Sequence, residues 1–149
     1  MRPWVPLAAL ALALAPLGVV RPLWVRGHSM EPGLPHGSLR WVLRAWASSA
    51  PRRGEVWLVA GPDGDSLKRV MGLPGERLSW SGPDLTVNGQ RLQEPWVAFP
   101  ERGGQGAWAC GEGYLLLGDN RPLSRDGRNW GPLPGTALKG RLLGPIAGS

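Results

Sequence analysis

The chain has 149 residues, which is the length of a single domain and long enough to bury a core. Its 23 glycines and 16 prolines exclude a helical bundle, and its single cysteine, Cys110, excludes a disulfide framework and a cysteine-rich zinc site. The formal charge of +6 includes three arginines in the first 26 residues; the remaining 14 basic and 11 acidic residues are too balanced for a nucleic-acid-binding surface.

The first predicted element is a membrane anchor. Residues 3–20 contain no charged side chain and consist mostly of Leu, Ala and Val. A run of this length is the lower limit for a helix that spans a bilayer, with a rise of about 27 Å. Trp4 and Trp24 flank the run, as aromatic residues at the two membrane interfaces would. We therefore predict that residues 1–26 form a transmembrane anchor in a lipid bilayer and that residues 27–149 form an extracytoplasmic domain.

Two other interpretations of this segment stay open. A cleavable secretory signal would use the Ala-Leu-Ala sequence at 13–15, but Pro16 would then follow the scissile bond, where its fixed φ and missing N–H make a poor substrate. A buried helix of a soluble domain is the other interpretation. Arg2 precedes the run and two arginines follow it, so the count of positive charges opposes an outside C-terminus. We nevertheless expect the C-terminal domain to lie outside the cytoplasm, for the functional reasons given below.

From residue 27 onward, short apolar runs alternate with turn signals. Pro-Asp-Gly at 62–64 and Asn-Gly at 88–89 are strong turn sequences, and residues 85–92 predict a hairpin. No stretch after residue 30 has ten residues of helical periodicity, and the Gly-rich segment 101–113 predicts a long surface loop. The expected fold is mostly β, a compact all-β domain with a folded or barrel-like sheet. Strands are expected at 38–43, 55–60, 67–71, 77–80, 85–87 and 114–117.

Three segments carry candidate catalytic residues. Ser29 lies in Gly-His-Ser-Met-Glu-Pro at 27–32, although a serine in such a loop is ordinarily a turn residue. Lys68 lies in an apolar run that ends in Gly-Leu-Pro-Gly. Only two of the 17 basic residues are lysines, so the choice of lysine over arginine inside a strand indicates a specific role. The simplest alternative is a lysine on an edge strand whose amine reaches the solvent. The third segment, 118–128, is a polar loop, and its simplest interpretation is a solvated turn.

In their order along the chain and in their residues, these segments resemble the sequence boxes of type I signal peptidases, which are membrane-anchored serine proteases with a lysine base. The resemblance spans residue 27 to about residue 133, together with the anchor, and implies a serine endopeptidase that cleaves N-terminal signal peptides from exported preproteins at the bacterial cytoplasmic membrane. The matching boxes are Ser-Met-x-Pro at 29–32, Arg-Gly-Glu-Val at 53–56, Lys-Arg-Val-x-Gly-Leu-Pro-Gly-Glu at 68–76 and Gly-Asp-Asn-Arg-x-x-Ser-x-Asp-x-Arg at 118–128.

The resemblance implies a role for residues of each box. The nucleophile falls on Ser29, the general base on Lys68, and the serine that orients the lysine on Ser124. The oxyanion hole would use the N–H of Ser29 and, two residues earlier, the N–H of Gly27. No metal ion or other cofactor is implied. Two ion pairs near the site fall on four further residues: Asp126 with Arg128, and Asp119 with Arg69.

A lysine acts as a base only when it is neutral. The ordinary lysine pKa is about 10.4, whereas a base that works near neutral pH requires about 7 to 8. Burial in an apolar wall lowers a lysine pKa because it disfavours the charged form, and a nearby carboxylate opposes that shift. We therefore expect Asp65 and Glu76 to point away from the Lys68 amine. Of the two histidines, His36 is the alternative base.

Position in the chain indicates the substrate class. Ser29 lies only nine residues after Val20, so the nucleophile stays near the membrane surface, where signal-peptide cleavage sites lie. We expect a monomer that binds its substrate extended, as a strand added to an exposed sheet edge. The alternatives are a dedicated conjugation-type or pilus-type maturation peptidase of the same class, a non-catalytic membrane-anchored peptide-binding β domain, and a cytosolic self-cleaving repressor, which the apolar N-terminus opposes.

Overall fold

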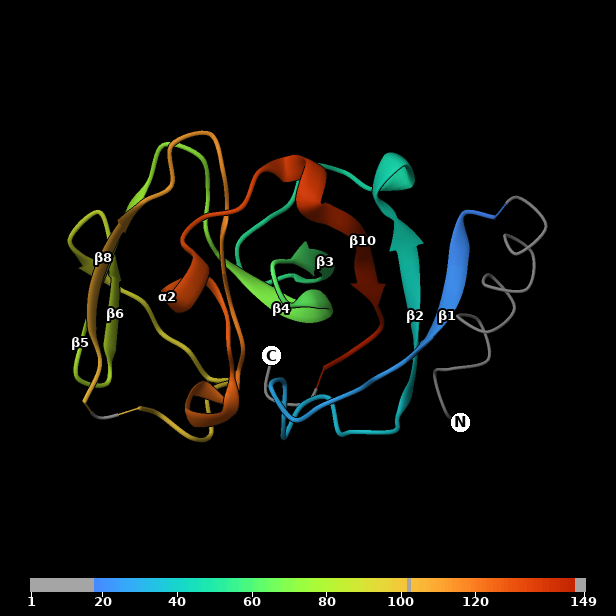
Figure 1. Cartoon of the computed structure of the whole chain (residues 1–149), viewed down its shortest axis with the longest axis horizontal. Helices are drawn as coiled ribbons and strands as arrows, with labels where there is room; N and C mark the ends of the chain where they lie inside the picture. Colours follow the sequence, from blue (N-terminus) through green and yellow to red (C-terminus); the bar gives the residue numbers. More distant parts are fainter. Residues whose placement is uncertain (1–17, 102, 147–149) are drawn as a thin grey trace.

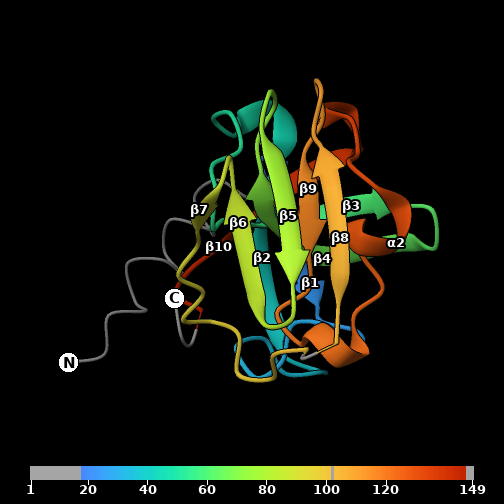
Figure 2. The ribbon, with the colours of Figure 1, turned by 90° about the vertical axis from the view of Figure 1, so that its left-hand side faces the viewer.

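The computed structural model describes residues 18–101 and 103–146, and their strands form two antiparallel sheets (Figure 1). The six-stranded sheet has the order β1-β2-β10-β3-β4-β9, and the four-stranded sheet has the order β7-β6-β5-β8. Figure 2 shows the four strands of the smaller sheet side by side. The larger sheet contains β1 (Val20–Trp24), β2 (Leu39–Arg44), β3 (Val56–Gly61), β4 (Gly64–Gly72), β9 (Leu115–Leu117) and β10 (Leu138–Leu143). The smaller contains β5 (Arg77–Ser81), β6 (Asp84–Val87), β7 (Gln90–Arg91) and β8 (Gln105–Ala109).

Helical structure in the described residues is limited to single turns. The α-helix α2 (Gly127–Trp130) has four residues, and its N-cap, Asp126, accepts a hydrogen bond from the Arg128 N–H. This confirms the mostly β prediction. Residues 18–101 and 103–146 also contain the short 3₁₀ helices η2 (Ala45–Ala47), η3 (Arg121–Leu123) and η4 (Gly135–Ala137).

The predicted strands form where apolar runs are bounded by turn sequences. All six are confirmed, with bounds that shift by a few residues. The predicted hairpin is β6–β7, and its turn places Asn88 at φ 50° and Gly89 at φ 82°, the left-handed conformation that an Asn-Gly turn provides. The Pro-Asp-Gly turn joins β3 to β4, where Gly61 pairs with Gly64.

Three strands in the described residues were not predicted: β1, β8 and β10. The segment 101–113, expected as a loop, contains β8, which pairs with β5. Its glycines make room for indole rings: a Cβ at Gly104 would lie 2.2 Å from Trp80, and one at Gly106 would lie 2.3 Å from Trp108. In β10, Gly140 interrupts the apolar run for a similar reason, since a Cβ there would lie 2.5 Å from Val42.

The predicted anchor segment, 1–26, is described only from residue 18 onward. Its residues 20–24 form β1, the edge strand that pairs with β2, so this part of the segment belongs to the β domain. Pro22 fits there because an edge strand tolerates a missing N–H. Trp24, expected to flank a helix, lies on this strand. Among residues 18–101 and 103–146, no helix is long and apolar enough to cross a membrane.

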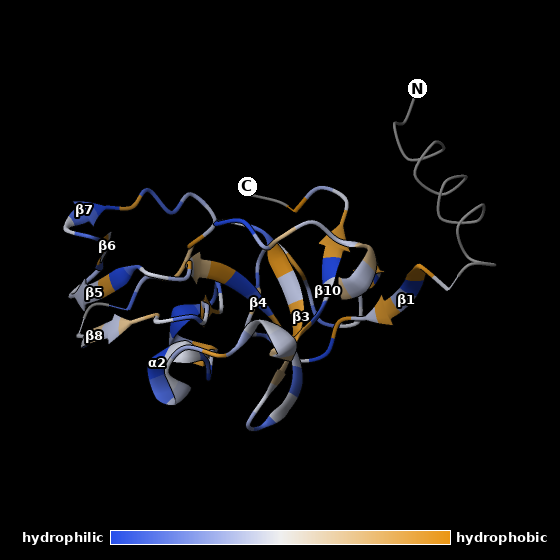
Figure 3. Cartoon of the chain, turned by 90° about the horizontal axis from the view of Figure 1, so that it is seen from above, coloured by the Kyte–Doolittle hydropathy of each residue, from blue (hydrophilic) through white to orange (hydrophobic). Residues whose placement is uncertain are grey.

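The core consists of three apolar clusters. Figure 3 shows hydrophobic residues along β3, whereas β7 and α2 are mainly hydrophilic. Side chains alternate along β3, with Leu58 in one cluster and Trp57 in another. The third cluster joins the two sheets and includes Met71 and Leu78. Between them, these clusters fix the strands and the loops from which the candidate catalytic residues project.

Candidate active site

Ser29 lies in the loop between β1 and β2, which packed apolar residues hold against the domain. The base of this loop is closed by the Val25 N–H, which donates to Ser38 O at 2.9 Å. Two side chains of the loop, Met30 and Leu34, are buried in the core, at 2% and 0% exposure. The Ser29 carbonyl accepts a hydrogen bond from the Asn120 N–H at 2.9 Å, which ties this loop to the one after β9.

Lys68 lies on β4 and contacts Ser29. Its side chain is 3% exposed, and Nζ donates to Ser29 Oγ at 3.0 Å. The two residues are 39 positions apart and come together where β4, paired with β3 at this position, lies beside the loop of Ser29. A hydroxyl within hydrogen-bond distance of an amine is the geometry that a nucleophile and its general base require.

The surroundings of Lys68 lower the pKa of its amine. Burial is the largest cause, and it is opposed by the charges of Asp126 and Asp119 and assisted by that of Arg128. The carboxylates expected to point away are both engaged elsewhere. Asp65 accepts from Lys139 Nζ at 2.6 Å, and Glu76 binds Arg53.

Lys68→Met is expected to be at least as stable as the wild type near pH 7. Because the pKa of Lys68 is lower in the folded than in the unfolded chain, the unfolded chain binds the proton more readily. The lysine therefore costs stability most fully below its folded pKa, and the cost shrinks as the pH rises towards about 10.4. Urea midpoints at pH 7 and pH 10 measure this difference. A Lys68→Met midpoint clearly below that of the wild type would instead identify Lys68 as a charged structural residue.

Two buried ion pairs hold the loop between β9 and α2. Arg69 donates from Nε and Nη2 to the Asp119 carboxylate at 2.8 and 2.6 Å, and both side chains are almost fully buried. Arg128 Nε donates to Asp126 Oδ1 at 2.8 Å, and the other oxygen of Asp126 accepts from the Gly118 N–H at 2.9 Å. These pairs fix the backbone that carries Ser124.

Ser124 lies beside Ser29 without bonding to the lysine. Its Oγ is buried and has no hydrogen-bond partner among the residues that the structure describes. A Cβ at Gly118 would lie 2.1 Å from Ser124 Oγ and 2.7 Å from the Ser29 carbonyl oxygen, so the glycine permits this close approach. The orienting role of Ser124 stays a prediction.

The two predicted oxyanion donors differ in their surroundings. Ser29 N–H donates to no backbone acceptor in the described part of the chain. Gly27 N–H, in contrast, donates to His36 Nδ1 at 3.0 Å. An oxyanion could accept a hydrogen bond from the Gly27 N–H only if this N–H gave up its bond to the imidazole. His36, the alternative base, thus binds the Gly27 N–H, whereas Ser29 Oγ is bound by Lys68.

Sequence reasoning missed two residues in the connection between β7 and β8 that contact the site: Glu94, which binds Arg121, and Trp96, which lies against Arg69. Arg121 is buried, binds Glu94, and donates from Nε to Gly118 O at 2.9 Å. Trp96 lies under Arg69, with the guanidinium 4.4 Å from the ring centroid. The arginine of the Gly-Asp-Asn-Arg box was the only signal for such a contact. Among residues 18–101 and 103–146, no group of three or more His, Cys, Asp or Glu residues is placed to hold a metal ion.

Comparison with known proteins shows which family the chain resembles. The profile of the family described as signal peptidase, peptidase S26, matches residues 1–146. Signal peptidase IB of Staphylococcus aureus (strain N315) is 28% identical over 145 residues, which cover 83% of this chain and 76% of the relative. Signal peptidase I of Bacillus licheniformis is 29% identical over 143 residues, which cover 85% and 77%.

The fold also matches a solved structure. A crystal structure of a signal peptidase I from Enterococcus faecalis V583 has a TM-score of 0.57 and 27% sequence identity, and the match covers 64% of this chain and 98% of that chain. The family profile spans nearly the whole sequence, and the relatives cover most of it. The chain therefore belongs to the peptidase S26 family of signal peptidases, which are serine peptidases.

Proposed function

We propose that this peptidase cleaves signal peptides with Ser29 as nucleophile and Lys68 as general base. The neutral Lys68 amine takes the Ser29 Oγ proton as Oγ attacks the scissile carbonyl carbon. The tetrahedral intermediate collapses to an acyl-enzyme ester, and the ammonium returns the proton to the departing amine. A water molecule, deprotonated by Lys68, then hydrolyses the ester. The observation that carries this proposal is the 3.0 Å contact between Ser29 Oγ and a buried lysine whose pKa is lowered.

Stabilisation of the oxyanion begins with the Ser29 N–H, which donates to no backbone acceptor in the described part of the chain. Backbone donors fixed before the reaction begins stabilise developing negative charge without a cost of reorganisation. The Gly27 N–H is the second donor only when it exchanges its bond to His36 for the oxyanion. In this proposal Ser124, whose buried Oγ and the Ser29 carbonyl oxygen both lie close to Gly118, orients the amine.

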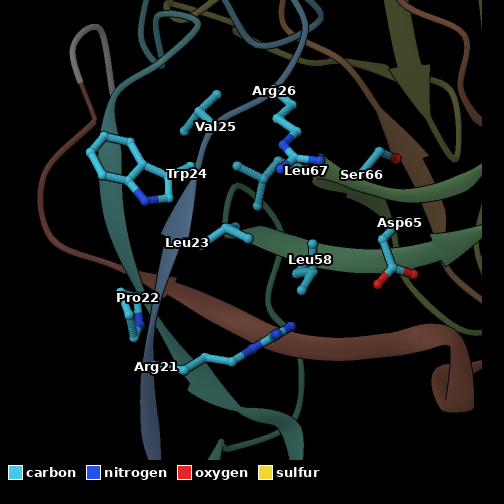
Figure 4. Close-up of a pocket in the computed structure, with 10 residues that line it drawn as sticks. All are labelled: Arg21, Pro22, Leu23, Trp24, Val25, Arg26, Leu58, Asp65, Ser66 and Leu67. Atoms are coloured by element: carbon cyan, nitrogen blue, oxygen red, sulfur yellow. The ribbon is translucent and has the colours of Figure 1, made fainter.

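An open groove along β1 and β4 fits an extended substrate. The groove, of about 360 Å³, lies between β1 and β4 (Figure 4). β1 is the edge of its sheet, and the part of β4 before Arg69 pairs only with β3, so both strands present unpaired backbone groups. An extended peptide would add to them as a strand. The groove reaches Leu67, next to the base, and Arg26, next to the loop of the nucleophile.

The walls of this groove favour small apolar side chains. In Figure 4, Leu23 lies on the side of β1 that faces β4, close to Leu58 and Leu67. These branched side chains form an apolar wall against which alanine-sized residues would pack. Such a wall would accommodate the small residues of an A-x-A sequence before the cut.

We place the catalytic domain at the outer surface of the bacterial cytoplasmic membrane, on a single-pass anchor. Four residues on one face of β1 and β2 support contact with a membrane: Trp24 pairs with Leu39, and Pro22 with Trp41, and these side chains are exposed. Indole rings at a sheet edge suit the membrane interface. Protease added to intact spheroplasts is expected to degrade the domain. Protection of the domain would put it in the cytoplasm and require another substrate class.

Cleavage of a purified preprotein in detergent tests the proposed function. The wild type is expected to release the mature protein by a cut after an A-x-A sequence, and Ser29→Ala is expected to leave the preprotein intact. Absence of cleavage by the folded wild type, or equal cleavage by both proteins, would refute the proposal. Cleavage of one exported protein and of no general preprotein would favour the dedicated maturation peptidase. We propose that the active unit is the monomer, because both residues of the catalytic pair come from one chain.

A further inference from the structure

We propose that Arg21 is a specificity-determining residue of the substrate groove and favours an acidic side chain about five residues before the cut. This inference rests on the proposed function, since it assigns a preference to the groove in which the extended substrate would lie. It is carried by the position of Arg21 at one end of the groove, by the absence of an acidic partner for it among the described residues, and by the number of residues between it and the catalytic pair.

The end of the groove that Arg21 lines carries a positive charge without a matching ion pair. In Figure 4, Arg21 and Arg26 lie at opposite ends of the groove, and the Arg21 side chain extends from β1 towards its other side. Arg21 is half-buried, and among residues 18–101 and 103–146 no acidic side chain forms an ion pair with it. Asp65 also lines the groove, but its carboxylate accepts from Lys139 Nζ at 2.6 and 2.7 Å. A carboxylate of the substrate would therefore be the counterion of Arg21.

The two ends of the groove set the direction of the bound substrate. Leu67, which lines the groove, directly precedes Lys68, so the cut lies at this end. Arg21, at the other end, directly follows the apolar run at 3–20 that we propose as the anchor. The substrate residues before the cut continue into the apolar segment of the signal peptide, which lies in the membrane. These residues therefore lie towards Arg21.

The length of the groove sets which substrate residue reaches Arg21. Between residues 21 and 26 an extended chain covers about 17 Å, at about 3.3 Å per residue. A substrate strand beside it advances by the same step, so the residue next to Arg21 is about the fifth before the cut. The A-x-A residues lie closer to the cut, against the apolar wall, and the acidic preference acts beyond them.

An ion pair with Arg21 acts on substrate binding and not on the chemical step. A glutamate side chain contacts Arg21 in the bound substrate and in the transition state alike, so it lowers KM with little change in kcat. Glutamate in place of glutamine is expected to raise kcat/KM about fivefold, and lysine, which Arg21 repels, is expected to lower it. The ratio of kcat/KM for the Glu and Lys substrates should be on the order of tenfold at low salt, and it should shrink at about 0.5 M salt, where ions screen the pair.

A set of preproteins that differ in one residue tests this preference. Gln, Glu or Lys is placed at each position from about the fourth to the sixth before the cut, with the A-x-A sequence unchanged. The wild type is expected to prefer Glu to Lys, and Arg21→Glu is expected to prefer Lys to Glu. The matched control is Arg52→Glu, which makes the same change of net charge at an exposed residue outside the groove. This control should keep the order of the wild type.

Several results would overturn the role of Arg21. The wild type would then cleave the Glu and Lys preproteins equally at every position, or Arg21→Glu would keep the preference for Glu. Reversal of the preference in Arg52→Glu as well would assign it to net charge and not to Arg21. If Arg21→Glu fails to fold, Arg21→Gln replaces it, and the difference between the Glu and Lys preproteins should then disappear.

Binding by Ser29→Ala separates this inference from the proposed function. Fluorescent peptides with the A-x-A sequence and the same Glu or Lys residue are titrated with this variant, and Kd is measured by anisotropy. Tighter binding of the Glu peptide, with no cleavage by the wild type, would support the preference of the groove and refute the proposed function. Cleavage by the wild type, with equal Kd for the two peptides, would overturn the preference and leave the proposed function intact.

Discussion

Ser29→Ala and Lys68→Ala are each expected to abolish cleavage, with a loss of kcat on the order of 10⁴-fold or more. Without Oγ there is no nucleophile, and without the amine the Ser29 proton has no acceptor, since Lys68 Nζ lies 3.0 Å from this hydroxyl. Because the two residues act as one unit, the double variant should be no slower than either single variant. Rates of preprotein cleavage measure all three. Retention of more than a few per cent of the wild-type rate by either single variant would remove that residue from the mechanism.

Lys68→Arg separates a base from a positive charge. Arginine keeps its proton at every working pH, so it would preserve an electrostatic role but not a basic one. We expect this variant to be as inactive as Lys68→Ala, with a fold intact by circular dichroism. Activity in Lys68→Arg would mean that the charge of Lys68, and not its lone pair, serves the reaction.

Asp119→Ala is expected to lower the free energy of unfolding by about 3 to 5 kcal/mol, because it leaves the buried guanidinium of Arg69 without its carboxylate. Arg69 and Asp119 are only 1% and 2% exposed, so water cannot replace the lost partner. Such a loss is a large share of the roughly 5 to 15 kcal/mol that stabilises a domain. The urea midpoint of the variant measures it.

Lys139→Ala provides the matched control for Asp119→Ala. It breaks the ion pair between Lys139 and Asp65, whose side chains are 43% and 47% exposed, respectively. Exposed pairs contribute about 0 to 1 kcal/mol, because water screens both charges. Equal midpoints for the two variants would contradict the assignment of Arg69 and Asp119 as a buried pair on which the loop depends.

The two buried ion pairs also explain how a lysine can have a lowered pKa beside two carboxylates. Asp126 and Asp119 both favour the charged form of Lys68. Each is bound by an arginine, Asp126 by Arg128 and Asp119 by Arg69, and Arg128 itself lowers the pKa of the lysine. Burial of the amine therefore prevails over two partly compensated negative charges.

Much of the fold could be predicted from local sequence, and the exceptions have physical causes. β3 and β5 are short apolar runs bounded by turns, so periodicity alone predicts them. β8 was missed because a glycine-rich sequence is typical of a loop. Here the glycines make room for Trp80 and Trp108, which is a requirement of tertiary packing. β1 was missed because it directly continues an apolar run, and only its pairing with β2 distinguishes it from that run.

The candidate site divides in a similar way. The boxes predicted Ser29 and Lys68, because each chemical role demands one residue type at one position. The partner of the Gly27 N–H is different: His36 lies nine residues away, and only the folded loop brings it to the glycine. The partner of Arg121 is likewise beyond local inference, since Glu94 lies 27 residues earlier in the chain.

The central claim, that neutral Lys68 is the base, is tested most directly by kcat/KM of the wild type as a function of pH. Burial lowers the pKa of this amine. The rate is therefore predicted to rise with pH and to reach its plateau below about 10.4, the ordinary lysine value. Below the lowered pKa the amine is protonated, cannot accept the Ser29 proton, and the rate should fall about tenfold per pH unit. A rate that stays constant from about pH 5 to 10, or that falls as the pH rises through this range, would contradict a lysine base.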